Sequence, residues 1–300
     1  MNQKVQDAIR NVQHALMHAA THIEPELVVR IQAMERQTRQ LMDELRSDDT
    51  RRDAYAASAD VLAMILKNIG IADETHLPLC QDTGMVVASV SVGPKAPFTM
   101  QEIEQVITEG AREAALAGNF RNSVVQDPVF DRKNTQNNLP PIIHWQPSES
   151  PGIVIDIMLK GFGSENCSSL DMLNPTAQVE DIIEVVKSRV IAAGGKPCPP
   201  IVVGIGLGGT SERALQLSKQ ALLRPVGVSH QDPRYAALEN RIEAALQHTH
   251  VGPGGMGGPL TTLGVAVEYE STHIAGLPVG ISISCWADRK TRIVLEAADA

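Results

Sequence analysis

The most constraining feature of the sequence is a strand–glycine–helix unit at residues 201–223. The apolar run IVVGIG is typical of a buried strand, and SERALQLSKQALL has the period of a helix. Between them Gly204, Gly206 and Gly209 spell G-x-G-x-x-G, the pattern of a dinucleotide-binding turn. Cys198 lies just upstream, between two prolines. This unit predicts an α/β protein and leaves two readings: a phosphate-binding turn, or a cysteine that carries the chemistry beside glycines that serve the fold.

Helices and strands are mixed along the chain but do not alternate strictly. Apolar residues recur at helical spacing in residues 1–70, whereas MVVASVSVG, GIVIDIMLKG, TLGVAVEYES, GISISCW and TRIVLEA read as strands. Thr99 and Glu102 form a capping box ahead of another helix. We therefore expect an α/β (mixed α+β) fold, a mixed β-sheet flanked by helices. A helical N-terminal region at residues 1–70 would pack on a main domain at residues 71–300.

The charge balance excludes some classes of partner. With 26 basic and 35 acidic residues, the net charge of −9 argues against binding to nucleic acid or to an anionic membrane surface. The sequence has no apolar run of the roughly 20 residues that span a bilayer, and its N-terminus has no apolar signal region. We expect a cytoplasmic protein with no membrane partner.

The cysteines are the next constraint. Cys80, Cys167, Cys198 and Cys285 are far apart and form no C-x-x-C pair, which disfavours a disulfide framework or a structural zinc site. Each taken alone reads best as a buried small hydrophobe. Three of them, however, lie beside a strand and a turn-prone segment: Cys80, Cys198 and Cys285. Three converging thiolates would suit an iron–sulfur cluster that has one iron without a protein ligand.

Other segments offer polar groups, each with a plainer alternative. In CQDTG, Gln81 and Asp82 could orient a ligand, or Asp82 could cap a turn in which Gly84 has positive φ. Arg121 is a candidate for bidentate carboxylate binding, although one surface arginine among many is the default. His273 is a candidate acid or base, although a lone histidine between strands is more often only hydrogen-bonded in place. The glycine-rich MLKGFGSENC could offer amides to an anion, or be a flexible loop.

The glycine motif alone is a weak signal for a dinucleotide. A dinucleotide fold also needs an acidic residue at the end of a second parallel strand, about 20 residues further on. Asp232 is the acidic residue available, and it precedes a proline as a helix cap does. The glycines more plausibly allow close backbone approach. An NAD-dependent oxidoreductase therefore remains an alternative, and a non-catalytic iron-binding subunit is another.

Several segments together resemble a known family. CQDTG, KGFGSEN, CPPIVVGIGLGG, the following S-x-x-AL-LSK-ALLRP-G, GPGGMGG and S-SCWA-R are similar to the iron–sulfur hydro-lyases, that is, the α-type region of class I fumarases and of L(+)-tartrate dehydratase. The resemblance runs from about residue 50 to the C-terminus. It implies a [4Fe–4S] cluster whose fourth iron binds the hydroxyl and a carboxylate of the substrate.

The resemblance also implies roles for individual residues. The cluster ligands would be Cys80, Cys198 and Cys285. The groups that grip the dicarboxylate would be Gln81, Asp82, Arg121 and the Gly163 backbone amide. Asp82 and His273 would be the catalytic residues, with His273 in a supporting or proton-transfer role. Lys160 and Ser164 are further candidate contacts, and Cys167 falls outside the ligand pattern and reads as structural.

In single-chain members of this family a C-terminal region supplies the catalytic base. The sequence given ends at Ala300 without that region. The resemblance therefore implies the α subunit of a two-subunit enzyme, completed by a β subunit in an α2β2 assembly. The expected reaction is reversible addition or removal of water at a small dicarboxylate. Fumarate and L-malate are favoured, because the loop reads KGFGSEN, and L-tartrate to oxaloacetate is a close second.

Overall fold

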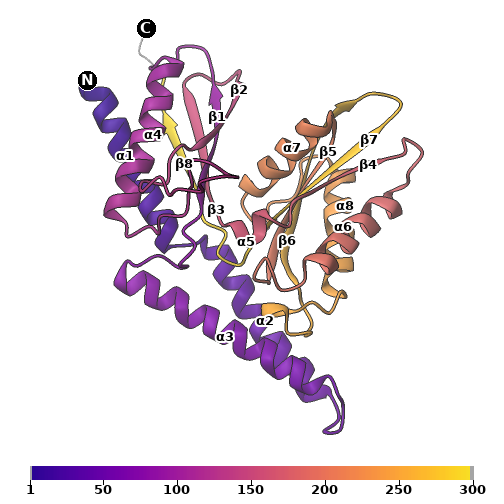
Figure 1. Cartoon of the computed structure of the whole chain (residues 1–300). Coiled ribbons are helices and arrows are strands. Elements are labelled where there is room, and N and C mark those ends of the chain that lie inside the picture. The colour runs from indigo at the N-terminus through magenta and orange to yellow at the C-terminus, as the bar shows by residue number, and fades with distance from the viewer. Residues whose placement is uncertain (1, 298–300) are drawn as a thin grey trace. The chain divides into compact units, whose positions relative to one another are not determined.

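The structure is a computed structural model that describes residues 2–297, and these residues fall into two compact units (Figure 1). Unit 1 comprises residues 2–23, 69–162 and 289–297, and unit 2 comprises residues 24–68 and 163–288. Each unit contains a four-stranded mixed sheet with helices packed on it, which confirms the expected mixed α/β fold. This grouping by contacts is separate from the expected division at residue 70, which stays a prediction.

Unit 1 is built on a sheet whose strands come from distant parts of the sequence. Its order is β2-β1-β3-β8. The strands are β1 (Met85–Val92), β2 (Ile142–Pro147), β3 (Ile153–Lys160) and β8 (Lys290–Leu295). β1 and β2 run parallel, and β3 is antiparallel to both β1 and β8. The sequence predicted β1, β3 and β8 but not β2, because IIHWQP ends in proline and lacks clear alternation.

The helices of unit 1 supply the other half of its core. α1 (Gln3–Thr21) and α4 (Met100–Ala117) pack against each other and contribute buried residues to the same cluster as β1, β3 and β8. α4 begins with the predicted capping box, in which the Thr99 hydroxyl accepts from the Glu102 N–H and the Glu102 carboxylate accepts from the Thr99 N–H. At Gly110 a Cβ would lie 2.6 Å from Val12, so glycine is what lets α4 approach α1.

Unit 2 has a second sheet, with strand order β4-β7-β5-β6. Its strands are β4 (Ser169–Leu173), β5 (Ile201–Gly209), β6 (Thr262–Thr272) and β7 (Leu277–Ser284). β5 is parallel to β6 and antiparallel to β7, and β7 is antiparallel to β4. β4 was not predicted from the sequence, because its five residues are only partly buried and form no apolar run. β5 is buried on both faces, and this is why IVVGIG reads as one continuous apolar run.

Helices cover both faces of the unit 2 sheet (Figure 1). α7 (Ser211–Leu223) packs on β5 and β7. On the other face α6 (Val179–Ala193) and α8 (Pro233–Gln247) share a core with the same strands. The remaining elements of the described chain are α2 (Pro25–Glu44), α3 (Arg52–Thr75), the short α5 (Phe162–Glu165) and the 3-10 turn η1 (Pro253–Gly255). α2 buries only a narrow stripe that includes Leu27 and Ile31.

The glycine motif lies inside β5 and sets the distance to α7. A Cβ at Gly206 would lie 2.0 Å from the Ala214 carbonyl oxygen of α7, and a Cβ at Gly204 would lie 2.1 Å from the Ser218 carbonyl oxygen. Gly280, the cross-strand partner of Gly206 in β7, would likewise meet Ala214 at 2.3 Å. Because the first two glycines lie mid-strand and face a helix, they do not form the turn that cradles a dinucleotide phosphate.

α3 is an apolar helix that sequence analysis did not single out. By length and composition it is long and apolar enough to cross a membrane, with 28% of its most apolar 18-residue window buried. One such helix is weak grounds for a membrane span, because core helices pass the same test. α3 buries Tyr55, Ala59, Leu62 and Ile65 inside the protein. The cytoplasmic location stays a prediction.

Candidate functional site

In unit 1 the CQDTG loop (residues 80–84) is fixed by its own aspartate. Asp82 Oδ1 accepts from the Gly84 N–H at 3.1 Å, and Gly84 has a φ of 89°. This is the turn that the sequence offered as the plainer alternative. Asp82 Oδ2 accepts from the Phe162 N–H at 2.8 Å, immediately before Gly163. The carboxylate therefore ties the loop that carries Cys80 to the start of α5.

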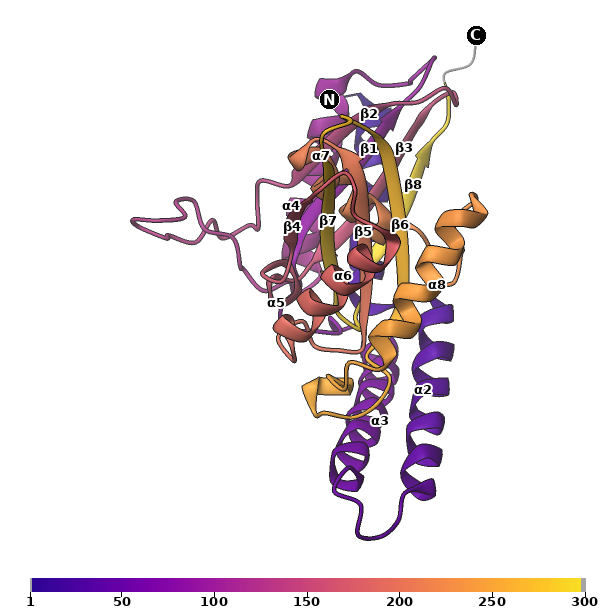
Figure 2. The ribbon, with the colours of Figure 1, turned by 90° about the vertical axis from the view of Figure 1, so that its right-hand side faces the viewer.

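Arg121 lies beside the same loop. Its carbonyl oxygen accepts from the Asn138 side-chain amide at 2.9 Å and from the Thr83 hydroxyl at 3.5 Å. Asn138 is 4% exposed and also accepts from the Ser123 N–H. It closes the base of the long segment between α4 and β2, which projects to the left in Figure 2. The structure thus brings Arg121 to the CQDTG loop, although the two are far apart in sequence.

Arg289 contacts the CQDTG loop, although it was not among the residues predicted for the site. Its Nη1 donates to the Asp82 carbonyl oxygen at 2.8 Å, and the residue is 2% exposed. Its Nε is buried and has no hydrogen-bond partner among the described residues. Lys160, at 3% exposure, is a second buried cation in this unit. A signal was available, since Arg289 is the arginine of the S-SCWA-R motif. Buried cations near a loop of this kind suit an anionic ligand.

In unit 2 two of the predicted cysteine ligands lie together. Cys198 precedes β5 and Cys285 follows β7, and these antiparallel neighbours bring both residues to one end of the sheet, called here the cysteine end. The Trp286 N–H donates to the Cys198 carbonyl oxygen at 3.4 Å and links the two segments. Cys198 has a φ of 55°, and its N–H donates to the Gly195 carbonyl oxygen at 3.1 Å.

Cys80 belongs to unit 1, so the three predicted ligands are divided between the units. Within either unit, the described residues contain no group of three histidine, cysteine, aspartate or glutamate side chains that could hold a metal ion. None of the four cysteines, all of them in the described part of the chain, is in a disulfide. Cys198 is exposed and Cys80 and Cys285 are half-buried. Accessible thiols on turns beside strands fit a soft iron–sulfur group.

The fourth cysteine, Cys167, lies just after Gly163 and contacts it. Cys167 donates through its thiol to the Gly163 carbonyl oxygen at 3.4 Å and packs against the core of unit 2. These contacts are those of a structural residue. Ser164 is 3% exposed, and Glu165 pairs with Lys219 of α7 at 2.6 Å. The ion pair holds the last residue of α5 to α7 within unit 2.

The structure does not bring His273 to the cysteine end of its own sheet. His273 opens the loop between β6 and β7 and is exposed. The Thr272 hydroxyl donates to the Gly209 carbonyl oxygen at 2.9 Å, which fixes this loop at the C-terminal end of β5. Cys198 lies before the N-terminal end of β5. Sequence spacing could not reveal this separation, because it depends on the direction in which each strand runs.

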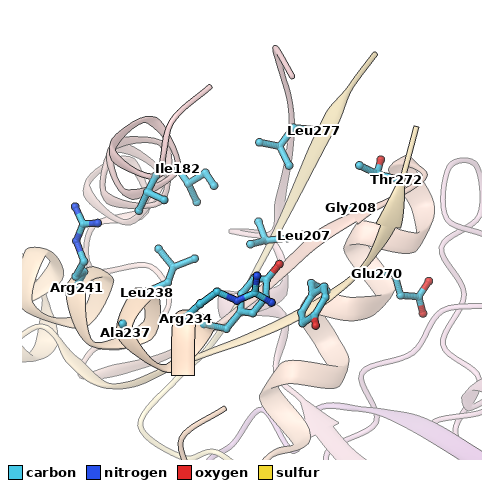
Figure 3. Close-up of a pocket in the computed structure, with 13 residues that line it drawn as sticks. Ile182, Leu207, Gly208, Arg234, Ala237, Leu238, Arg241, Glu270, Thr272 and Leu277 are labelled. Carbon is cyan, nitrogen blue, oxygen red and sulfur yellow. The ribbon is translucent and has the colours of Figure 1, made fainter. Parts of the chain in front are cut away.

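A cavity of about 400 Å³ also lies at the C-terminal end of β5 (Figure 3). Ile182 of α6 and Leu238 of α8 flank Leu207 there, and the rings of Tyr235 and Tyr269 stack at 4.0 Å. Burial raises the pKa of the Tyr235 phenol. None of the predicted site residues lines this cavity. It is an apolar space apart from the cysteine end. Of the glycine motif at residues 204–209, Leu207 and Gly208 line it.

Comparison with known proteins gives the class. The family model described as fumarate hydratase (Fumerase) matches residues 11–294, so the chain belongs to the fumarate hydratase family of hydro-lyases. A Methanocaldococcus jannaschii protein, named provisionally as L(+)-tartrate dehydratase subunit alpha, is 40% identical over 255 residues, covering 82% of this chain and 89% of that protein. The L(+)-tartrate dehydratase subunit alpha of Escherichia coli (strain K12) is 29% identical over 234 residues, covering 77% and 76%. The family expected from the sequence motifs is therefore confirmed.

Proposed function

We propose that this chain is the α subunit of a hydro-lyase that reversibly adds or removes water at a four-carbon dicarboxylate. The observation that carries the proposal is the convergence of Cys198 and Cys285 at one end of a sheet in a fumarate hydratase family member. Fumarate and L-malate are the substrates favoured by the loop sequence KGFGSEN. The names of the two relatives make L-tartrate the direct competitor.

The proposed cofactor is a [4Fe–4S] cluster held by Cys80, Cys198 and Cys285. Three accessible thiols support it, because three cysteine ligands for four irons leave one iron without a protein ligand. When bound, the cluster supplies a Lewis acid for the hydroxyl that leaves or enters. The packing of Cys167 against the core of unit 2 supports leaving it out of this set.

The chain's own residues have separate tasks in this proposal. Arg121 binds a substrate carboxylate, since a guanidinium can donate two parallel hydrogen bonds to it. Gln81 is exposed beside Cys80 and offers its amide to a substrate oxygen. Asp82 already accepts from two backbone amides, so its first task is to hold the CQDTG loop to the segment that leads into Gly163. The catalytic roles of Asp82 and His273 stay predictions.

A β subunit is the proposed partner. Support comes from the relatives, which are named as alpha subunits. The partner would supply the base that removes the proton next to a carboxylate, and an α2β2 complex is the expected assembly. Activity of the purified α subunit should therefore be far below that of the reconstituted complex, when both are measured with fumarate, L-malate and L-tartrate under anaerobic conditions.

The first experiment is the iron and acid-labile sulfide content of anaerobically purified, reconstituted protein. About four of each per chain are expected. Cys80→Ser, Cys198→Ser and Cys285→Ser should each lower this content, whereas the matched control Cys167→Ser should keep it. Protein that folds but binds no iron would remove the cluster from the proposal. A fully loaded complex that leaves every dicarboxylate of the panel unchanged would count against the hydro-lyase itself and favour a non-catalytic subunit.

Air should inactivate the reconstituted complex. An iron without a protein ligand is open to solvent and easily lost, so hydration activity should fall with exposure to air and return after anaerobic reconstitution. Far-UV circular dichroism, recorded in parallel, should show that the loss of activity is not accompanied by unfolding. Full activity after hours in air would contradict a catalytic cluster.

A further inference from the structure

The cavity at the C-terminal end of β5 has a floor of side chains from three strands of the unit 2 sheet. Leu207 of β5 and Tyr269 of β6 are register partners, so their side chains lie on the same face. Leu277 of β7 lies two residues from Val279, the partner of Leu207 in that strand, and therefore shares the face. Leu207, Tyr269 and Leu277 all line the cavity, so its floor is fixed by strand pairing.

Two helices cover this floor without filling the space above it. Ile182 of α6 and Leu238 of α8, each 7% exposed, border the cavity from the two helices (Figure 3). Domain interiors hold few voids larger than a water molecule, whereas ligand pockets commonly measure about 300–1,000 Å³. At about 400 Å³ this mostly apolar space has the size of a ligand pocket.

The charged side chains at this cavity are already paired. Among the described residues that line it, three carry a charge, and the pairs are Arg234 with Asp232, Arg241 with Glu180, and Glu270 with Arg213. An ion that left water for this space would lose its hydration, and these partnered groups would compensate little of that loss. The cavity therefore favours a neutral molecule.

The ends of the two helices do not change this preference. Helix N-termini attract anions, and both α6 and α8 begin beside the cavity. Asp232 of α8 accepts from the Arg234 N–H at 2.9 Å, and Asp181 of α6 accepts from the Gln178 N–H at 2.7 Å. These carboxylates of the chain itself offset the positive ends of both helices, which weakens their attraction for a bound anion.

Aromatic rings form one side of the cavity. Two of the three tyrosines of this aromatic-poor chain meet there. The rings of Tyr235 and Tyr269 stack at 4.0 Å with an angle of 13° between their planes, and the His230 ring lies 5.2 Å from Tyr235. Aromatic side chains gain binding energy from contact with further rings, beyond that of the area they bury. Burial raises the pKa of the Tyr235 phenol, so its hydroxyl stays protonated and can donate to a polar substituent.

We infer that this cavity binds a neutral aromatic molecule of the size of naphthalene, between α6, α8 and the sheet of unit 2. The size follows from the volume, because an apolar cavity of about 150 Å³ accepts a single benzene ring and this cavity measures about 400 Å³. The inference is independent of the proposed function. No residue predicted for that function lines the cavity, and Cys198 lies before the opposite end of β5.

Binding of N-phenyl-1-naphthylamine, a neutral aromatic dye whose fluorescence rises in apolar surroundings, tests the site in the full chain. Wild type should bind the dye saturably, with one molecule per chain. Ala237→Trp adds a bulky side chain at an exposed position that lines the cavity, and it should weaken binding at least about tenfold. Ala244→Trp lies about two turns further along α8, outside the lining. It is the matched control and should bind the dye as wild type does.

Tyr269→Ala is a second variant, chosen because Tyr269 is 41% exposed and its loss spares the core. Removing one ring of the stack should weaken dye binding about 3- to 10-fold. Absence of saturable binding to wild type would overturn the inference. Affinities unchanged in both Ala237→Trp and Tyr269→Ala would overturn it too, because the dye would then occupy another apolar patch, such as the exposed Phe130.

Competition against the dye decides the chemical class. 2-Naphthol, 2-naphthoate and 2-naphthylmethylammonium share one ring system and differ in charge at neutral pH. 2-Naphthol should displace the dye at the lowest concentration, and both ions should be at least about tenfold weaker. Decahydro-2-naphthol, which keeps the carbon skeleton without aromatic rings, should also be weaker. An ion that competes as well as 2-naphthol would overturn the neutral class, and equal competition by decahydro-2-naphthol would overturn the aromatic class.

Photolabelling locates the site without relying on fluorescence. Benzophenone is itself a neutral aromatic molecule, and under irradiation it forms a bond to carbon at a nearby C–H group. The label should map to the peptides that contain Leu238 or Leu277, and excess 2-naphthol or the Ala237→Trp substitution should prevent it. Labelling confined to other peptides, such as the one that contains Phe130, would contradict the assignment.

Discussion

At the residue scale, a Cβ added at Gly206 would disturb the packing of α7 on the sheet of unit 2. Gly206 and its cross-strand partner Gly280 both face the Ala214 carbonyl oxygen, and a Cβ at Gly206 would lie 2.0 Å from it. Since the obstacle is helix backbone, Gly206→Ala should lower the free energy of unfolding by about 1–3 kcal/mol or more. Gly70→Ala is the control: it has open space in α3 and should stabilise by up to about 1 kcal/mol. Equal urea midpoints for the two variants would show that α7 is not held this closely.

Loss of the Asp82 carboxylate should disturb both the CQDTG loop and the backbone at Phe162. Asp82→Ala removes the acceptor for the Gly84 and Phe162 amides. Allowing for its partial exposure, the loss should be about 1–2 kcal/mol of unfolding free energy. Asp82→Asn keeps one carbonyl oxygen and should lose less. Hydrogen exchange at the Phe162 amide is the direct measurement, and unchanged protection in Asp82→Ala would mean that another group holds this segment.

These residues also mark what sequence could and could not predict at this scale. The turn at Asp82, the capping box at Thr99 and the helix cap at Asp232 were all legible, because each depends on a few neighbouring residues. Asn138 and Arg289 were not, because their partners are distant in sequence and the contacts exist only after folding. The contact between Arg289 and Asp82 was not predicted, although Arg289 belongs to the S-SCWA-R motif that was noted for Cys285.

At the scale of the element, α8 depends on the charge of its first residue. Asp232 caps α8 by accepting from the Arg234 N–H. Hydrogen bonds from the Arg234 side chain and backbone lower the pKa of the Asp232 carboxyl from 3.8 to about 2. Since the folded pKa is the lower one, its contribution to stability is present above the unfolded value and is lost as pH falls from 3.8 through about 2.

Asp232→Asn should therefore flatten the acid side of the stability curve. Asn still caps a helix but has no carboxyl to protonate, so the fall in Tm between pH 4 and pH 2 should be smaller than in wild type. Asp43→Asn, at an exposed position near the end of α2, is the control and should follow the wild-type curve. Parallel acid slopes for Asp232→Asn and wild type would show that this carboxylate does not contribute.

The direction in which each strand runs could not be predicted from the sequence. The apolar runs of β1, β3, β5, β6 and β7 were identified, because alternation and buried apolar runs are local signals. Which ends of those runs meet was not predictable, since it follows from the order β4-β7-β5-β6 and from the parallel pairing of β5 with β6. That order brings Cys198 to Cys285 and carries His273 to the opposite end.

At the scale of the whole molecule, the chain enters unit 1 three times, and β8 is its last contribution. β8 pairs with β3, and Arg292 bonds the Asp156 carboxylate across the two strands at 2.6 Å. Ile293 and Leu295 of β8 lie in the core of unit 1. A unit assembled from separated segments cannot be read from composition, because no linker or change of residue type marks where the chain leaves one unit for the other.

Removing β8 should therefore unfold one unit and spare the other. A chain that stops after residue 289 leaves the edge of β3 without its partner strand and opens the core that Ile293 and Leu295 close. Unit 2 draws all four strands of its sheet from residues 169–284 and keeps them. In hydrogen exchange, β1 and β3 should lose protection while β5 and β7 keep it. The milder Arg292→Ala, which only removes a partly exposed ion pair worth about 0–1 kcal/mol, is the control and should leave both sheets protected. Loss of protection in β5 together with β3 after the truncation would show that the two units fold as one cooperative body.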